Sequence, residues 1–516
     1  MKERSANRQL VINMIASLST FAVGLGVRFF LTPYIVRSLG REAYGFVGLS
    51  ADILSYTGLV TIALNSMAGR FVTIKYTAGD VEGANKYYSS VFFSNIVLAA
   101  FTMLFAAGCI LYLEHIIQIP PHLIFDVKLL IGFLAINNVI GLITGIWGVS
   151  TFIKNRLDLT NVRGIIGNFI NATLLLCLFA FFAPHIWYMG TAGLVMTLYV
   201  AITNKKFSQL LTPDLKVRLQ DYDWRCVLDL IQSGAWNVVS RLGSIIGHEV
   251  DLLLANLFIT PSAMGQFAIV RGIPFLVLSL FSTISSVFGP ILTNLWAQNK
   301  MDEMRNELLK GVRILGFFAN IPMVIFFVLS DSFYALWVPD QDANVLRWVT
   351  IFSCFGSIFS MPLEVLWNVF TITNKIKVSS LVMLTLQGII FITWLVGLPL
   401  MTSEFGKLLF LCGAGTFWSV VKSLFFLPLY GAHCLKFDRL TFYSPLLKSI
   451  LGFSILMVVS STAKCFVRVD SWLMLFVLSI GVSIVGCVLN FYVILRSQDR
   501  LFILNFFLRR LGVKHE

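Results

Sequence analysis

The sequence predicts an all-α polytopic membrane protein with about 14 transmembrane helices. Hydrophobic residues make up 57% of the 516 residues and charged residues only 13%, against about 25% charged in a soluble protein. The mean hydropathy is +0.83. Apolar runs of 18 or more residues recur along the whole chain, and each is long enough to span a bilayer as a helix. Strands of a membrane barrel would read as alternating segments of about ten residues.

Fourteen spans follow from the apolar runs. They are 10–36, 43–64, 89–113, 123–150, 162–183, 186–203, 230–258, 264–292, 311–336, 345–371, 377–400, 404–430, 443–463 and 470–495. The first is not followed by a small-residue cleavage site, so we expect it to be retained.

The basic residues predict how the chain is oriented. Of the 39 Lys and Arg residues, 28 lie at the termini and in every second loop, six lie in the opposite loops and five lie within spans. By the positive-inside rule both termini are then cytoplasmic, in agreement with an even number of spans. The excess of basic residues on the cytoplasmic side therefore explains the net charge of +13. For this reason we expect no nucleic-acid partner.

Nothing in the sequence predicts an enzyme, a cofactor or a metal site. The eight Cys residues show no paired spacing, and most lie in apolar spans, which predicts neither a disulfide framework nor a zinc site. There is no Gly-rich phosphate loop between a strand and a helix. The loops predicted to face outward are short and hold no acid–base constellation.

An internal repeat predicts two homologous halves. Trp147 aligns with Trp367, and at almost the same offset in residue number Asn155-Arg156 aligns with Asn374-Lys375. We expect an N-terminal six-helix half at 1–203, a cytoplasmic linker at 204–226 and a C-terminal six-helix half at 227–430. Residues 431–516 add two helices and a basic cytoplasmic tail. Because six is even, the two halves are parallel repeats, a plan in which the transport site lies between them.

Two helices of the repeat carry matching polar stripes. In the segment 233–251 the stripe is Ser233, Asn237, Ser240, Ser244, His248 and Asp251, and at the equivalent positions of the first half it is Asn13, Ser17, Thr20, Gly24 and Arg28. At about 100° per residue each set lies on one helix face. Because lipid cannot satisfy polar groups, each stripe should face a partner helix or a wet cavity. We expect the two stripes to face each other across a transport path.

The first hairpin of the chain resembles a known family. The run 29–40 (FFLTPYIVRSLG), then Tyr44-Gly45, is similar to the first hairpin of Wzx-type polysaccharide transporters of the MOP superfamily, which also contains MATE exporters and MurJ flippases. The segments 251–254 (DLLL) and 265–267 (GQF) resemble the family's signature around the seventh and eighth spans. The span count and two-half plan extend the likeness to the whole chain.

The resemblance implies a flippase in the cytoplasmic (inner) membrane. Members of the family move a polyprenyl-pyrophosphate-linked oligosaccharide, such as a repeat unit of O-antigen, capsule or exopolysaccharide, from the inner to the outer leaflet by alternating access. Arg and Lys residues in their cavity hold the pyrophosphate. The implied partners are this lipid, the surrounding membrane lipids, a coupling proton or sodium ion and polysaccharide assembly proteins. A MATE-type drug or cation exporter and a MurJ-like lipid II flippase remain as alternatives.

Charged and polar residues inside the spans are the candidate site. A charge within the bilayer costs about 3 kcal/mol unless water, a partner or a ligand compensates it. The candidates for substrate binding are Arg28, Arg271, Arg241, His248, Asn13 and Asn237; those for ion coupling or ion pairing are Asp52, Glu249, Asp251, Glu364 and Lys422. The four acidic residues balance the bases, so a network that only fixes helix packing stays open as the alternative. Pro274 and Pro362 predict kinks in spans eight and ten.

Overall fold

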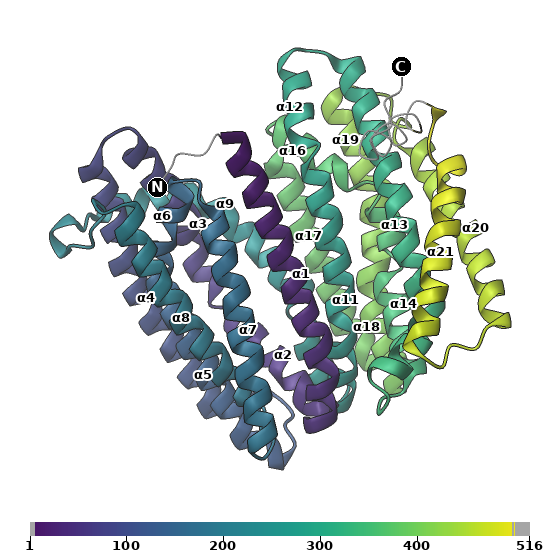
Figure 1. Ribbon diagram of the computed structural model, residues 1–516, viewed down its shortest axis with the longest axis horizontal. Helices are drawn as coiled ribbons and strands as arrows, with labels where there is room; N and C mark the ends of the chain where they lie inside the picture. The colour runs from purple at the N-terminus through teal and green to yellow at the C-terminus, as the bar shows by residue number, and fades with distance from the viewer. Residues whose placement is uncertain (1–5, 498–499, 501–516) are drawn as a thin grey trace. The chain divides into compact units, whose positions relative to one another are not determined.

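A computed structural model describes residues 6–497 and residue 500, and within these residues it contains helices and no strand (Figure 1). The predicted basic tail lies outside the described residues except for Arg496, Ser497 and Arg500. By contacts the chain divides into two compact units, Met1–Gly265 and Gln266–Glu516. Contacts and sequence repetition are different criteria, so the boundaries of the two halves stay a prediction.

The first unit is built from ten α-helices among its described residues. They are α1 (Ala6–Leu39), α2 (Arg41–Ser55), α3 (Gly58–Thr77), α4 (Val81–Ile116), α5 (Ile124–Thr144), α6 (Val149–Ile153), α7 (Leu157–Phe181), α8 (Tyr188–Leu211), α9 (Trp224–His248) and α10 (Asp251–Phe258). The 3₁₀ turns are η1 (Pro121–Leu123), η2 (Gly145–Gly148) and η3 (Leu219–Asp221).

Neighbouring helices of the first unit pack through apolar side chains. The main pairs are α1 with α7, α3 with α9, α4 with α5, and α8 with both α5 and α7. One core cluster forms around Tyr88, Val91 and Leu230, and a second around Ile35, Leu175 and Phe179. At the start of α4, Asp80 accepts a hydrogen bond from the backbone N–H of Gly83 and pairs with Lys75. This bond to the Lys75 ammonium lowers the pKa of the Asp80 carboxyl.

The second unit contains the remaining helices of the described chain. They are α11 (Pro261–Ser286), which begins before the boundary, α12 (Gly289–Ala297), α13 (Met301–Trp337), α14 (Ala343–Cys354), α15 (Ser357–Ser360), α16 (Trp367–Ile372), α17 (Ile376–Leu400), α18 (Glu404–Val421), α19 (Leu427–Leu435), α20 (Tyr443–Phe466) and α21 (Trp472–Val493). A 3₁₀ turn, η4 (Glu364–Leu366), precedes α16, and a π-helix, η5 (Lys422–Phe426), joins α18 to α19.

The long helix α13 forms the centre of the second unit, and the two C-terminal helices dock on it. Figure 1 shows α20 and α21 lying along α13, and α13 is mostly buried. The buried Asn490 of α21 donates to the carbonyl of Phe317, 2.9 Å away, and Asn320 of α13 donates to the carbonyl of Ser449 on α20 at the same distance. Lys464 of α20 also pairs with Asp331 of α13. The added helix pair is therefore fixed to its unit by buried polar bonds.

The helix plan agrees with the predicted class. Within the described residues, ten helices are long and apolar enough to cross a membrane, or twelve if each of two bent helix pairs is one span. The helices α8 and α9 have 24 and 25 residues but are more polar. With them, each of the fourteen predicted ranges overlaps a helix or a run of helices. Large apolar side chains such as Phe30, Phe181 and Phe466 are exposed, as expected of a lipid-facing surface.

Two of the spans are sharply bent. The helices α2 and α3 meet at 64°, and the α14–α15 segment meets η4–α16 at 57°. The second break contains Pro362, between α15 and η4, so the predicted interruption of span ten is confirmed. In contrast, α11 runs through Pro274.

Backbone features recur at the offset of the repeat. Gly79 and Asn299 have positive φ angles of 82° and 54°, and they are separated by the same offset in residue number as Trp147 and Trp367. Asn155 and Asn374, which the sequence repeat aligns, have φ angles of 50° and 55°. Positive φ is uncommon outside glycine and is found most often at Asn or Asp. Turns of the same conformation thus follow helices at positions that lie about one repeat offset apart. This agrees with the predicted duplication of the chain.

Candidate functional site

The polar stripe of α1 is bonded to α7. The side chain of Asn13 is buried, and its Nδ2 donates to the Oδ1 of Asn155, 3.0 Å away, just before α7. Its Oδ1 accepts from the backbone N–H of Asp158 at 3.0 Å and from Gln9 at 3.0 Å. Asp158 in turn accepts two hydrogen bonds from Arg156, at 2.9 and 3.0 Å. This part of the stripe therefore bonds to α7 and the turn before it, whereas we expected it to face the stripe of α9 across a transport path.

Other residues of the α1 stripe also bond to α7. The hydroxyl of Thr20 donates to the carbonyl of Asn161, 3.1 Å away, and the Asn161 amide donates to the hydroxyl of Ser17 at 2.8 Å. An added Cβ at Gly164 would lie 3.3 Å from the Thr20 side chain. Small residues thus allow α1 and α7 to approach closely, as is common between membrane helices.

One residue of the polar stripe of α9 bonds to α3, whereas Ser233, Ser240 and His248 of the same stripe are exposed. The amide of Asn237 donates to the hydroxyl of Ser66 on α3, 2.9 Å away. One turn earlier the two backbones touch, since an added Cβ at Gly234 would lie 2.0 Å from the carbonyl oxygen of Ala63. The small residues on this face of α9 are therefore a packing requirement.

Arg241 and Glu249 form an ion pair at the bend between α2 and α3. The Arg241 Nη1 and the Glu249 Oε1 are 2.6 Å apart, and both side chains are mostly buried. Arg241 also donates to the carbonyl of Ser55, 3.2 Å away, while the hydroxyls of Ser55 and Tyr56 donate to Glu249. An added Cβ at Gly58 would lie 3.3 Å from Arg241. The pair holds the end of α9 to the break in the second span.

The remaining candidates of the first unit lie on α1, α2, α9 and α10. Arg28 on α1 is exposed and near enough to Tyr44 to act on it electrostatically. His248 is exposed at the last residue of α9, whereas Asp251 is buried at the first residue of α10. Asp52, His248 and Asp251 each have an interaction partner. Arg271, another candidate for substrate binding, belongs to the other unit.

The second unit holds a pair of opposite charges where two irregular spans meet. Glu364 begins the 3₁₀ turn η4, Lys422 begins the π-helix η5, and their charges act on each other. The Lys422 ammonium lies 5.9 Å from the ring centre of Trp367. The carbonyl of Glu364 accepts from Ser285 at 3.0 Å. Single π-helical turns inside α-helices often mark functional sites. Arg271, on α11 of the same unit, is half-buried and has a partner.

A second Lys–Trp pair occupies the corresponding place in the first unit. Lys205 of α8 lies 5.6 Å from the ring centre of Trp147 in η2. Trp147 and Trp367 are repeat equivalents, and Lys205 and Lys422 are separated by close to the same offset in residue number. The sequence repeat aligns the two Trp residues. Lys205, in contrast, falls in the predicted linker 204–226 and was counted there as a loop charge. The signal that could have revealed this Lys–Trp pair is the spacing of Lys205 and Lys422, which is close to the offset of the repeat.

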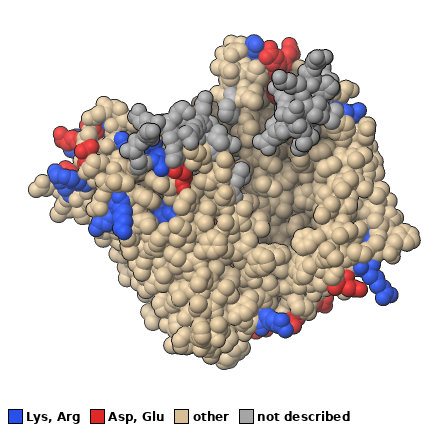
Figure 2. All heavy atoms as spheres, in the orientation of Figure 1, with Lys and Arg blue, Asp and Glu red and all other residues tan. Residues whose placement is uncertain are grey.

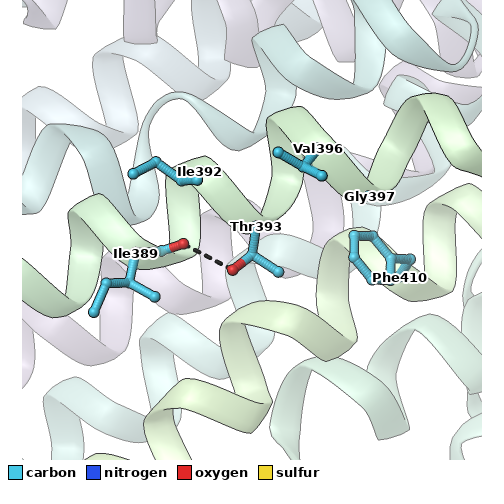
Figure 3. Close-up of a pocket in the computed structure, with 6 residues that line it drawn as sticks. All are labelled: Ile389, Ile392, Thr393, Val396, Gly397 and Phe410. Carbon is cyan, nitrogen blue, oxygen red and sulfur yellow. Dashed lines mark hydrogen bonds between the residues drawn. The ribbon is translucent and has the colours of Figure 1, made fainter.

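Two surface pockets of the described residues show no catalytic arrangement. One, of about 440 Å³, lies between α17 and α18 and is almost entirely apolar; Figure 3 shows Phe410 beside Gly397 and the bond from Thr393 to the carbonyl of Ile389. The other, of about 520 Å³, lies beside the 117–120 loop, which Asn256 holds by two backbone hydrogen bonds of 2.8 and 2.9 Å. Among the described residues no group of three or more His, Cys, Asp or Glu residues could hold a metal ion.

Together these features define a multi-pass helical membrane protein with the fold of MOP-superfamily transporters. The chain is similar to a structure of the lipid II flippase MurJ in an inward closed conformation, with a TM-score of 0.67 and 14% identity over 92% of this chain and 98% of that one. It is also similar to an inward-facing multidrug resistance MATE transporter, with a TM-score of 0.65 and 13% identity over 84% and 98%. At these identities the likeness shows the fold alone.

One relative is similar over the whole chain. It is the uncharacterized membrane protein EpsK of Bacillus subtilis (strain 168), which is 28% identical over 507 residues, covering 98% of this chain and 99% of the relative. No family model matches the chain.

Proposed function

We propose that this protein moves a lipid-linked oligosaccharide from the inner to the outer leaflet of the cytoplasmic membrane. The observation that carries the proposal is the likeness to the lipid II flippase fold over 92% of the chain. The cargo would be a polyprenyl-pyrophosphate-linked repeat unit of O-antigen, capsule or exopolysaccharide. Its sugar would pass between the two halves as they rock, while its lipid tail stays in the bilayer.

The extent of the likeness favours a lipid cargo over a drug. The MATE structure covers 84% of the chain and the MurJ structure covers 92%. The chain also has the docked pair α20 and α21, after the twelve spans that we predict to be repeats. A MATE-type cation exporter remains the second candidate because its TM-score of 0.65 is nearly as high. A MurJ-like role, with lipid II itself as the cargo, is the third.

We assign the pyrophosphate to Arg28, Arg271 and His248. Guanidinium groups bind phosphate oxygens by charge-assisted hydrogen bonds, often two at a time. Arg28 is exposed on its helix, which leaves its guanidinium accessible to a ligand. Asn13 donates to Asn155 just before α7, Asn237 donates to α3 and Arg241 donates to the carbonyl of Ser55 on α2, so their proposed part in binding is to position the helices that line the path.

We assign ion coupling to the charged pair of the second unit. Glu364 and Lys422 have opposite charges at the junction of a broken span and a π-helix, and a proton taken up by Glu364 would release Lys422. Asp52, Glu249 and Asp251 are the corresponding candidates in the first unit. Polysaccharide assembly proteins are the partners that such a flippase would supply with substrate.

Deletion of the gene tests the proposal. The lipid fraction of the deletion strain should accumulate one lipid-linked glycan that stays on the inner leaflet, and a plasmid copy of the gene should restore its export. Accumulation of lipid II in its place would favour the MurJ-like role. Normal glycan export together with a raised sensitivity to cationic drugs would favour the MATE-type role and overturn the proposal.

A further inference from the structure

The junction of η2, α7 and α8 in the first unit contains a buried arginine. Arg163 of α7 is only 7% exposed, and its Nη1 donates to the side-chain oxygen of Asn204 on α8. A guanidinium has five N–H donors and is always charged. No carboxylate pairs with Arg163 among the residues that the structure describes. A buried charge is costly unless it is paired or liganded, so the Arg163 guanidinium is suited to bind an anionic group.

A second cation and an aromatic face complete the junction. Lys205 follows Asn204 on α8, and its ammonium lies 5.6 Å from the ring centre of Trp147. Gly148, next to Trp147, leaves space beside Asn204, since an added Cβ there would lie 3.6 Å from the Asn204 Oδ1. Arg163 and Lys205 thus lie on either side of one asparagine, with an indole alongside.

The nearby carboxylates are already engaged. Asp158, at the start of α7, accepts from Arg156 at 2.9 and 3.0 Å and from Gln9 at 2.9 Å. Asp214 accepts from the hydroxyl of Tyr76 at 3.5 Å, and Lys154 lies over the Tyr76 ring, 5.3 Å from its centre. The positive charge of Arg163 and Lys205 is therefore left without a protein counter-ion in the described chain.

The depth of the junction matches that of lipid phosphates. Arg163 is the seventh residue of α7, so at about 1.5 Å per residue it lies about 9 Å from the helix start. The charge distribution predicts this end of the helix to be cytoplasmic. Figure 2 shows Lys and Arg side chains gathered at one end of the first unit above an uncharged flank. Anionic lipids are abundant in the cytoplasmic leaflet, and Trp residues favour this level of the membrane.

We infer that the η2–α7–α8 junction binds the phosphate group of an anionic membrane lipid. Arg163 and Lys205 donate charge-assisted hydrogen bonds to the phosphate oxygens, and Trp147 packs beside the headgroup at the membrane interface. The phosphate belongs either to a bulk lipid such as phosphatidylglycerol or to a polyprenyl pyrophosphate. The polyprenyl pyrophosphate case rests on the proposed function, whereas binding of a bulk lipid does not.

Lipid titration of the purified full-length protein tests the site. The probes are phosphatidylglycerol, a sugar-free polyprenyl pyrophosphate, inorganic phosphate and, as the uncharged reference, phosphatidylcholine. The dissociation constant is read from the lipid-dependent rise in melting temperature. Arg163→Gln and Lys205→Gln should each weaken binding of an anionic lipid about tenfold, and whichever lipid binds more tightly identifies the source of the phosphate.

Lys154→Gln is the matched control. It also removes a lysine from an aromatic ring at the same predicted side of the membrane, and it should change binding less than twofold. Lys205 is exposed, so its variant should fold even if Arg163→Gln does not. Equal losses in all three variants, equally tight binding of phosphatidylcholine, or binding of inorganic phosphate with no preference for lipid would each overturn the inference.

Discussion

Glu364 and Lys422 place two opposite, half-buried charges where η4 and η5 begin. Removing one member of such a pair leaves the other uncompensated, which costs about 3 kcal/mol. We predict that Glu364→Gln and Lys422→Met each lower the free energy of unfolding by about this amount, and that the double variant loses less than the sum. Thermal unfolding in detergent measures the coupling. Additive losses would contradict the pairing.

The same variants separate pairing from ion coupling. If Glu364 carries the coupling proton, Glu364→Gln should abolish the dependence of transport on pH while leaving some downhill movement of substrate. A variant with normal pH dependence would restrict Glu364 to a structural role.

The arginines assigned to the pyrophosphate give a sharper test of binding. Arg28→Ala and Arg271→Ala should each abolish export of the glycan while the protein still inserts and unfolds at a normal temperature, because each removes a charge-assisted contact. Complementation of the deletion strain measures export. Full complementation by both variants at normal expression would contradict the assignment.

Residue patterns predicted the polar stripes but not the partners of their side chains. Spacing placed Asn13 and Arg241 on polar faces, yet it could not show that Asn13 reaches Asn155 or that Arg241 reaches Glu249. Such pairs depend on which helices are neighbours. Lys205 was counted as a solvated loop charge because nothing in a sequence shows that a lysine folds back over an indole.

At the scale of elements, the contact between α3 and α9 depends on one glycine. A methyl group at Gly234 would lie 2.0 Å from the carbonyl oxygen of Ala63, so Gly234→Ala must push the helices apart. We predict a loss of about 3 kcal/mol in unfolding free energy. The control is Gly26→Ala on α1, where nothing lies within 4 Å and where alanine should favour the helix by about 0.5 kcal/mol. A Gly234→Ala protein as stable as the control would contradict the close packing.

The docking of α20 and α21 depends on buried amides. Asn490→Leu removes the donor to the carbonyl of Phe317 and should destabilise the protein by about 1–2 kcal/mol, the value of a hydrogen bond between membrane helices. Ser483→Ala on the same helix is the control, because Ser483 bonds only to the carbonyl of Ser479 in its own helix. Limited proteolysis of the 467–471 loop should increase in Asn490→Leu alone.

Helix positions were predictable where apolar runs are long, and helix breaks were predictable where proline is present. The break at Pro362 followed from its missing N–H. The 64° bend between α2 and α3 had no such signal, because its cause is tertiary: Arg241 and Glu249 hold the backbone at Ser55. The π-helix at Lys422 likewise has no sequence pattern of its own.

For the whole molecule, composition and the repeat were enough to predict the class of fold. The matched turns at Gly79 and Asn299 agree with a duplication. The identity of the cargo could not be predicted in this way, because proteins with this fold include both a lipid II flippase and multidrug transporters.

The most direct measurement of the central claim uses the purified protein in liposomes. A fluorescent polyprenyl-pyrophosphate-linked oligosaccharide is placed in one leaflet, and its appearance in the other is followed with a membrane-impermeant quencher. We predict that the wild-type protein moves this lipid, and that Arg28→Ala and Arg271→Ala do not. Movement at the rate of protein-free liposomes, with a cationic dye transported instead, would contradict the account.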